Sequence, residues 1–329
     1  MATSINTAFS EFNTDTVNLL KDRSDKAKSS RDWLYTQLNG LQDKDDLNFP
    51  YKYELKHINY GSFERKTKIR ELDDVDLMFC FVADGATYSK SSYGNTYTIH
   101  TPNAGNRLKY LSDSDILNSR KVVNKVKLSL AKIDQYKSAD LHSKGEAVTL
   151  NLLSYEWVFD IVPCFYTDTD LYLIPDGNGY WKPTDPRIDQ KRVTDANKAQ
   201  QGRVLQLIRT LKYWNRRNSS LTIGSYLFEN IVINYVNSQT ELNQWIDFNL
   251  RSFFYYLSSA ILNTVNDPKG YQGDLNTFTY AQRLSISQKA DWAYGKADEA
   301  IKAEIDEKDN KKSINKWREL FGTDFPSYG

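Results

Sequence analysis

A pair of acids opens an apolar, strand-like stretch of this chain. Residues 73–82 read Asp-Asp-Val-Asp-Leu-Met-Phe-Cys-Phe-Val. Side chains alternate between the two faces of a strand, so Asp74 and Asp76 point the same way, whereas Asp73 lies on the other face. The apolar run over 77–82 indicates a buried strand rather than an exposed turn. The chain must therefore build a core around a strand that carries two carboxylates on one face at its start.

Two neighbouring carboxylates repel each other unless a cation lies between them. Mg²⁺ prefers hard oxygen ligands and shares them with phosphates, so it is the cation we expect here, with Mn²⁺ as a substitute. The alternative is an acidic cluster that is simply solvated at the end of a loop. The apolar residues that follow Asp76 favour the metal site.

A Gly-Ser pair, Gly61-Ser62, precedes the acidic strand. Gly61 can adopt backbone angles that are closed to other residues and lets a ligand approach the main chain. Ser62 adds a hydroxyl donor, and consecutive backbone N–H groups in such turns bind anions. Gly-Ser alone is common by chance. Upstream of Asp-x-Asp on a strand, it predicts a turn that binds phosphate.

A single acid interrupts a second apolar run. Asp160 lies within residues 157–164, which read Trp-Val-Phe-Asp-Ile-Val-Pro-Cys. A lone carboxylate there is costly unless it is paired or bound to a metal. One reading is a salt bridge to an Arg or Lys in the core, and the other is the third carboxylate of a two-metal site. The first motif favours the metal site, and Pro163 indicates that the strand ends, or lies at a sheet edge, just past the acid.

Together these motifs resemble the cGAS/DncV-like nucleotidyltransferases, the CD-NTases of bacterial anti-phage (CBASS) signalling. This family belongs to the polymerase-β-like superfamily. The resemblance implies an α+β fold in which a mixed α/β catalytic lobe, residues 1–199, and a mainly helical C-terminal lobe, residues 200–329, surround a cleft. Further segments that resemble the family are 172–176 with Trp181, 183–186, 211–214, 224–226, 267–268 with 274–276, and 317–322 with 325–326.

The resemblance also implies a role for each candidate residue of the catalytic lobe. Asp74, Asp76 and Asp160 would be the catalytic carboxylates and would hold two Mg²⁺ ions. Gly61 and Ser62 would cradle the donor triphosphate.

Three residues of the helical lobe would bind the nucleotide as well. The resemblance implies that Lys212 contacts the triphosphate with Ser225 beside it, and that Tyr226 stacks on a nucleobase. Without the resemblance, Lys212 would be read as a solvated lysine beside Leu211 on a helix over 200–217. Tyr226 would be one ordinary tyrosine among 22.

The implied activity is synthesis of a cyclic di- or oligonucleotide from NTPs such as ATP and GTP. The product would be a second messenger for a separate effector protein, and regulatory partner proteins are expected. Two alternatives remain open. One is a template-independent nucleotidyltransferase that extends RNA 3′ ends, and the other is a non-catalytic regulator that binds nucleotides.

The composition restricts the partners. Basic and acidic residues number 43 and 42, whereas a protein that coats nucleic acid usually has a basic excess, so we expect no constitutive duplex partner. Three histidines and two separated cysteines cannot supply the tetrahedral zinc set that the animal relative carries in an insertion. The chain shows no signal peptide and no apolar run near the ~20 residues that span a bilayer. We therefore expect a cytoplasmic protein with no membrane partner.

Hydrophobic periodicity predicts the remaining elements. A Gly-, Ser-, Asn- and Tyr-rich excursion over 83–106 is expected near the site, and a polar linker over 308–312 is expected before a helix capped by Ser313. The predicted strands are 53–55, 77–82, 147–153 and 155–166. The predicted helices run to about 41 and over 113–133, 200–217, 226–236, 244–263, 287–306 and 313–321.

Overall fold

The structure is a computed structural model, and it describes residues 2–44, 48–92, 94–217 and 221–329. Its fold is α+β, as predicted, and its described residues divide into two compact units. The sheet unit comprises residues 20–65 and 71–190. The helical unit comprises residues 2–19, 66–70 and 191–329. No helix in the described part of the chain is long and apolar enough to cross a membrane.

The division differs from the predicted lobes 1–199 and 200–329. The later boundary falls at 190/191, inside helix α6 (Pro186–Ala199), and two early segments belong to the helical unit. Aromatic packing explains the first of these segments, since the ring of Phe9 lies 5.0 Å from that of Trp317 and 4.9 Å from that of Phe325. Ile69 is buried in the same core.

One mixed sheet of eleven strands runs through the described residues of the sheet unit. The main strand order is β1-β2-β9-β10-β11-β4-β6-β5; β3 pairs with β4, and β8 pairs with β7 and β9. β2 and β9 run parallel, and the other described strand pairs are antiparallel. The strands are β1 Ile58–Tyr60, β2 Asp74–Phe81, β3 Thr87–Lys90, β4 Tyr97–His100, β5 Ser112–Asp113, β6 Ile116–Leu117, β7 Asp140–Lys144, β8 Ala147–Asn151, β9 Val158–Tyr166, β10 Tyr172–Pro175 and β11 Trp181–Thr184.

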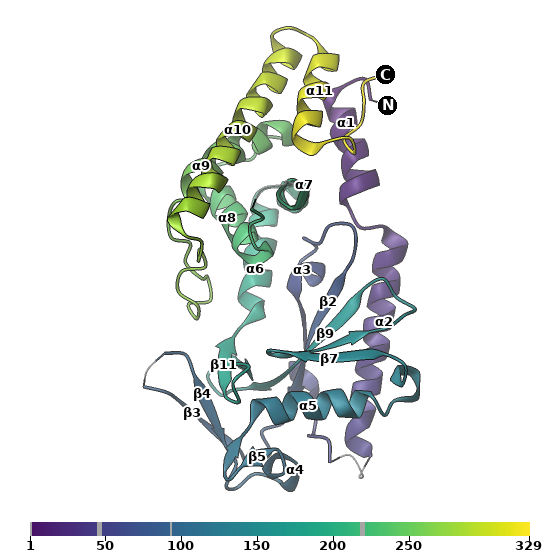
Figure 1. Ribbon diagram of the computed structural model, residues 1–329, viewed down its shortest axis with the longest axis vertical. Coiled ribbons are helices and arrows are strands. Elements are labelled where there is room, and N and C mark those ends of the chain that lie inside the picture. The colour runs from purple at the N-terminus through teal and green to yellow at the C-terminus, as the bar shows by residue number, and fades with distance from the viewer. Residues whose placement is uncertain (1, 45–47, 93, 218–220) are drawn as a thin grey trace. The chain divides into compact units, whose positions relative to one another are not determined.

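Helices α2 and α5 flank this sheet (Figure 1). α5 packs against β7, β8, β9 and β10, and it buries Val122, Val126 and Leu130. α2 buries Leu34 and Leu38 but leaves Trp33 about half exposed. The helices are α2 Lys21–Gly40, α3 Gly61–Glu64, α4 Asn106–Lys109 and α5 Ser119–Leu130, with 3₁₀ turns at Leu41–Asp43, Glu54–Lys56 and Asp134–Tyr136.

Two strand predictions in this unit were wrong. Residues 53–55 do not form a strand; the 3₁₀ turn Glu54–Lys56 stands there, and Leu55 is 86% exposed, so it contributes nothing to a core. Pro163 does not end β9, which continues to Tyr166. The pairing of β9 with β8 stops at Ile161 and its pairing with β10 starts at Phe165. Pro163 lies between these two ladders, where its missing N–H removes no bond of either.

The excursion over 83–106 also differs from its prediction. It contains the hairpin of β3 and β4, with Thr87 paired to His100 and Lys90 to Tyr97. β9, β10 and β11 stand between β4 and the acidic strand β2, so the hairpin is not beside the acids.

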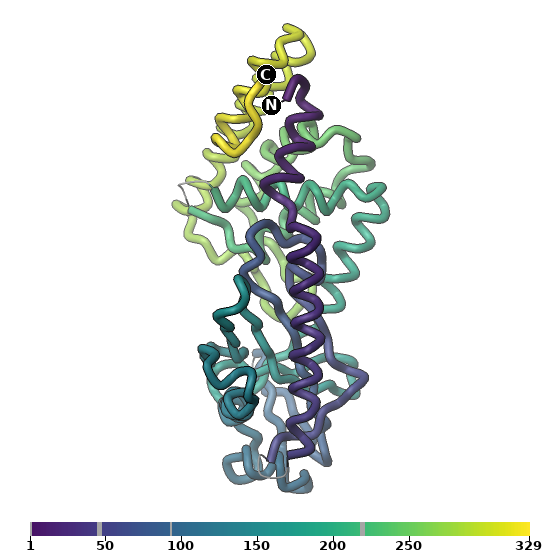
Figure 2. The backbone as a smooth tube through the Cα atoms, turned by 90° about the vertical axis from the view of Figure 1, so that its right-hand side faces the viewer, coloured from purple at the N-terminus to yellow at the C-terminus, as the bar shows by residue number. Residues whose placement is uncertain are grey.

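Seven α-helices belong wholly or partly to the described helical unit. The two termini meet in this unit, where Ala2 pairs with Tyr328, and Figures 1 and 2 show the N and C labels side by side. The helices are α1 Ile5–Phe12, α6 Pro186–Ala199, α7 Arg203–Arg217, α8 Ser225–Ser238, α9 Ile246–Ala260, α10 Tyr280–Ile305 and α11 Asn310–Phe321, and a π-helical turn, Asn13–Val17, follows α1.

Several helices in this unit differ from the predicted ones: α10 begins at Tyr280 rather than at 287, and α6 was not predicted. Two further differences have a clear cause. The helix predicted to run from the start of the chain to 41 is broken, because α1 ends in the π-helical turn before α2 begins. Ser313 is not the N-cap of α11; it is buried within the helix. Asp309 is the cap, because its side chain accepts a hydrogen bond from the backbone N–H of Lys312, so part of the predicted linker is helical.

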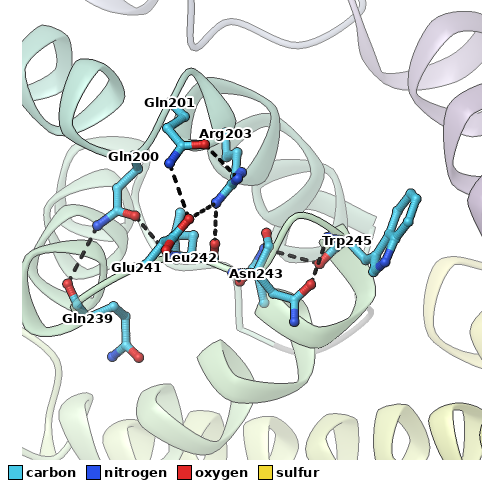
Figure 3. Close-up of polar contacts among 9 residues, drawn as sticks. Gln200, Gln201, Arg203, Gln239, Glu241, Leu242, Asn243 and Trp245 are labelled. Carbon is cyan, nitrogen blue, oxygen red and sulfur yellow. Dashed lines mark hydrogen bonds and ion pairs between the residues drawn. The ribbon is translucent and has the colours of Figure 1, made fainter.

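The α8–α9 connection is fixed by polar contacts (Figure 3). The side chain of Gln200 accepts a hydrogen bond from the backbone N–H of Leu242 at 2.7 Å and donates to the carbonyl of Gln239 at 3.5 Å. Arg203, at the start of α7, bonds both the carboxylate of Glu241, at 3.0 Å, and the carbonyl of Leu242. These contacts anchor the connection to Gln200, which precedes α7, and to Arg203, the first residue of α7.

Asp247 gives the helical unit a pH-dependent stability. It is 2% exposed, and burial raises its pKa from 3.8 to about 6, assisted by the charge of Glu304. The folded state holds the proton of the Asp247 carboxyl group more tightly than the unfolded chain does. The contribution of this proton to the free energy of unfolding is therefore complete below pH 3.8 and is lost as the pH rises through 6. A shift of this size corresponds to roughly 3 kcal/mol.

We therefore expect Asp247→Asn to increase the free energy of unfolding by about 1–3 kcal/mol at pH 7.5 and to change it little at pH 4. The amide of asparagine removes the charge but keeps an oxygen that can accept the same hydrogen bonds from backbone N–H groups. Denaturant unfolding at the two pH values measures the effect. The exposed Asp291→Asn is the control, and an equal gain from Asp247→Asn at both pH values would contradict the prediction.

Candidate active site

Strand register brings the acids of the sheet unit together. Asp76 on β2 is the parallel register partner of Asp160 on β9, and Asp74 lies on the same face of β2 as Asp76. Tyr60 on β1 pairs with Asp76 from the other side, and Thr149 on β8 pairs with Asp160. Residues in register on neighbouring strands share a face of the sheet. Tyr60, Asp76, Asp160 and Thr149 therefore form one row across four strands, and Asp74 adjoins it.

Burial of the neighbouring residues on β2 and β9 fixes the positions of the three acids. On the opposite face, Val75, Leu77, Phe159 and Ile161 are at most 1% exposed. The face that carries the acids continues into a small buried cluster, whereas the three acids themselves are half-buried. The acids thus lie where an otherwise apolar face opens to solvent. The cluster consists of Met78, Cys80, Val162, Cys164, Tyr172 and Ile174.

Gly61 approaches the carboxylate of Asp76 more closely than any other residue type would allow. Its φ is +76°, and a Cβ atom placed on it would lie 1.8 Å from Asp76 Oδ2. The residue opens the short helix α3, which Phe63 anchors by burial, and Ser62 follows directly. The predicted phosphate turn and the predicted acids are therefore neighbours in the sheet unit.

Asp160 has a hydroxyl partner rather than a basic one. Thr149 Oγ1 donates to Asp160 Oδ1 at 2.6 Å, and no salt bridge to Asp160 is found within the described ranges. This contradicts the alternative in which Asp160 is a core acid paired with Arg or Lys. Thr149 could not be recognised from the sequence, because a threonine on a strand carries no distinguishing signal.

Tyr60 contributes a neutral phenol to the row. Burial raises the pKa of Tyr60 well above 10, and the charge of Asp76 raises it further. The hydroxyl therefore stays protonated at neutral pH, and no negative charge from Tyr60 adds to that of the acids.

The donor set suits a hard cation. Asp74, Asp76 and Asp160 offer only carboxylate oxygens, the ligands that Mg²⁺ prefers. In the part of the chain that the structure describes, no group of three His, Cys, Asp or Glu side chains by itself forms a metal-holding arrangement. Mg²⁺ sites commonly complete their shell with water and substrate phosphates. The oxygen donors of the three acids therefore suit Mg²⁺ in their chemistry, and metal binding by these residues stays a prediction.

In the helical unit, Lys212 is engaged in a buried ion pair. Its Nζ on α7 lies 2.5 Å from Glu229 Oε2 on α8 and 3.3 Å from Thr67 Oγ1, and the hydroxyl of Thr67 donates to the same carboxylate at 2.8 Å. Lys212 and Glu229 are 8% and 4% exposed. The solvated-lysine alternative is therefore wrong, and the triphosphate contact stays a prediction. Glu229 was missed, although a lone acid among the apolar residues of α8 is a visible signal.

Ser225 and Tyr226 are the first residues of α8. The Tyr226 hydroxyl donates to Asp267 Oδ1 at 3.0 Å, and the ammonium of Lys269 lies 4.3 Å from the centre of the Tyr226 ring. Although burial opposes ionisation of Asp267, backbone N–H groups of Lys269 and Tyr271 and the charge of Lys269 lower its pKa. The Tyr226 ring is thus fixed in orientation, and its stacking on a base stays a prediction.

The eight predicted site residues consequently fall into two groups. The sheet unit brings together Gly61, Ser62, Asp74, Asp76 and Asp160. The helical unit contains the other three, Lys212, Ser225 and Tyr226.

A known protein is similar to this chain along its whole length. No protein-family model matches the chain. A probable cyclic nucleotide synthase of Bacillus cereus strain VD146 is 44% identical over 335 residues, which cover 100% of this chain and 99% of the relative.

Solved structures share the fold over nearly the whole chain. CdnC of Escherichia coli MS115-1, in its complex with HORMA-deltaN, has a TM-score of 0.70 and 18% identity, covering 98% of each chain. The Vibrio cholerae DncV cyclic AMP-GMP synthase, with nonhydrolyzable GTP, has a TM-score of 0.71 and 11% identity, covering 99% of this chain and 98% of that one.

The full-length relative, a probable cyclic nucleotide synthase, shows that this chain is a nucleotidyltransferase, and the shared fold is consistent with that class. With the full-length relative at 44% identity, the chain belongs to the cGAS/DncV-like nucleotidyltransferases, the CD-NTases. The family resemblance noted from the motifs is thereby confirmed.

Proposed function

We propose that this nucleotidyltransferase joins NTPs into a cyclic di- or oligonucleotide in a Mg²⁺-dependent reaction. The observation that carries the proposal is the face shared by Asp74, Asp76 and Asp160 on two parallel strands. The B. cereus relative, a probable cyclic nucleotide synthase, supports the cyclic product.

The protein's part in this chemistry is to bind and to orient. A bound Mg²⁺ would supply charge neutralisation and a lowered pKa for the attacking ribose hydroxyl. Asp74, Asp76 and Asp160 provide the oxygen ligands, and the buried residues on the opposite face keep the two strands in register. Gly61 leaves its backbone open to the triphosphate, and Ser62 offers a hydroxyl. Phosphoryl transfer of this kind needs positioning more than covalent help from the protein.

We infer the biological setting from the resemblance to the family. The product would act as a second messenger on a separate effector protein in anti-phage defence. A regulatory protein partner is part of the proposal, because CdnC, a fold neighbour, forms a complex with HORMA-deltaN.

Labelled NTPs incubated with the purified chain and Mg²⁺ test the activity directly. A product that resists phosphatase is expected; EDTA should abolish its formation, and excess Mg²⁺ or Mn²⁺ should restore it. Supplied RNA that is lengthened instead would favour the 3′-end nucleotidyltransferase. Mg²⁺-dependent nucleotide binding without turnover, over a broad range of metal, pH and partner conditions, would favour the regulator and refute the proposal.

A further inference from the structure

Thr149 contacts the carboxylate of Asp160, its neighbour in the row of residues that crosses four strands. Thr149 on β8 and Asp160 on β9 are register partners in an antiparallel ladder. The threonine hydroxyl donates to Asp160 Oδ1 at 2.6 Å. On its other side, Asp160 is the register partner of Asp76. Asp160 therefore lies between a neutral donor and a second carboxylate.

This hydrogen bond restricts the orientation of the Asp160 carboxylate toward a bound cation. A carboxylate rotates about its last side-chain bond, and a donor held on one oxygen fixes that rotation. The β-branched side chain of threonine is stiff, so the donor itself is well placed. With Oδ1 bonded to Thr149, Oδ2 is the oxygen left for a metal ion. Residues that hydrogen-bond metal ligands in this way commonly change metal affinity or activity by about 10–100-fold when removed.

We propose that Thr149 is a positioning residue for nucleotidyl transfer, which holds Asp160 in the orientation that a divalent cation requires. The inference rests on the proposed function, since it assumes that Asp160 is a metal ligand. It assigns to Thr149 a role that does not involve contact with the substrate.

Three variants separate this role from a structural one. Thr149→Val keeps the β-branched shape and removes the hydroxyl, whereas Thr149→Ser keeps the hydroxyl. Thr98→Val is the matched control, because Thr98 is a half-buried strand threonine on β4, which β10 and β11 separate from β9. Two quantities are measured on the full chain: the dissociation constant of Mn²⁺ alone, by electron paramagnetic resonance, and the Mg²⁺ concentration that half-saturates product formation.

Thr149→Val is expected to raise both quantities by about 10–100-fold, while Thr149→Ser and Thr98→Val stay within about threefold of the wild type. Mn²⁺ binding by Thr149→Val that equals the wild type would overturn the inference, as would a wild type that binds no Mn²⁺. If the wild type binds Mn²⁺ but forms no nucleotide product, the proposed function fails, and the Mn²⁺ comparison still decides the role of Thr149. If circular dichroism shows Thr149→Val to be unfolded, Thr149→Ala replaces it under the same criteria.

Discussion

An Asp76→Asn variant is expected to form product at least about 10³-fold more slowly than the wild type, a loss of roughly 4 kcal/mol of transition-state stabilisation. Asp76 lies in the middle of the acidic row, with Asp160 in register on one side and Tyr60 on the other. The amide keeps the shape of the side chain but removes the charge and one of the two oxygens. Both the attacking hydroxyl and the leaving pyrophosphate would then lose charge neutralisation.

The neighbouring Asp73→Asn is the control for this variant. Asp73 precedes β2 and is exposed, and its side chain falls on the other face by the period of the strand. It should retain activity within about threefold, because its carboxylate adds no ligand to the row. Initial rates of product formation at saturating Mg²⁺ measure both variants. An Asp76→Asn rate within tenfold of the wild type would remove Asp76 from the proposed catalytic set.

Gly61→Ala is expected to reduce activity by at least about 100-fold, because the new methyl group would occupy the position of the Asp76 carboxylate. The added Cβ would lie 1.8 Å from Asp76 Oδ2 and 2.6 Å from its Cγ. Since the side chain of aspartate is short, the carboxylate cannot move aside without leaving its place in the row. The positive φ adds a further cost of about 1–2 kcal/mol to stability for any residue with a Cβ.

Gly94→Ala is the control that separates the contact between the new Cβ and Asp76 from the cost of a positive φ. Gly94 has a φ of +77°, close to the +76° of Gly61, but a Cβ at Gly94 would meet nothing within 4 Å. Both variants should lose about the same free energy of unfolding from the backbone, and only Gly61→Ala should lose activity. Denaturant unfolding and product-formation rates, measured on both proteins, make the comparison. Equal activity of the two variants would show that the contact between Gly61 and Asp76 is dispensable.

The catalytic face could be predicted because it depends on local periodicity. The period of two places Asp74 and Asp76 together on any strand, and the apolar residues around Asp160 required a second buried strand. The structure has both strands, β2 and β9, in parallel register. A carboxylate in an apolar run was the signal for Asp160, and the same signal was present and overlooked at Glu229.

Other features depend on contacts between distant segments, which periodicity does not describe. Pro163 lies inside β9 at a point that neither β8 nor β10 pairs with, while β2 continues along its other side. Thr149 acquires its importance from the residue opposite, not from its own neighbours in the sequence. The packing of α1 in the helical unit depends on aromatic rings near the other end of the chain, among them Trp317 and Phe325.

The division into units has a consequence for dissecting this enzyme. The chain passes from one unit to the other at 19/20, 65/66, 70/71 and 190/191, so no single cut yields either unit whole. A fragment that starts at 191 would lack Phe9 and Phe12 and so would lose the contacts that these two rings make with Trp317, Phe321 and Phe325. Separating the two units therefore calls for a rearranged gene, with loops that rejoin 19 to 66 and 70 to 191, rather than a truncated one.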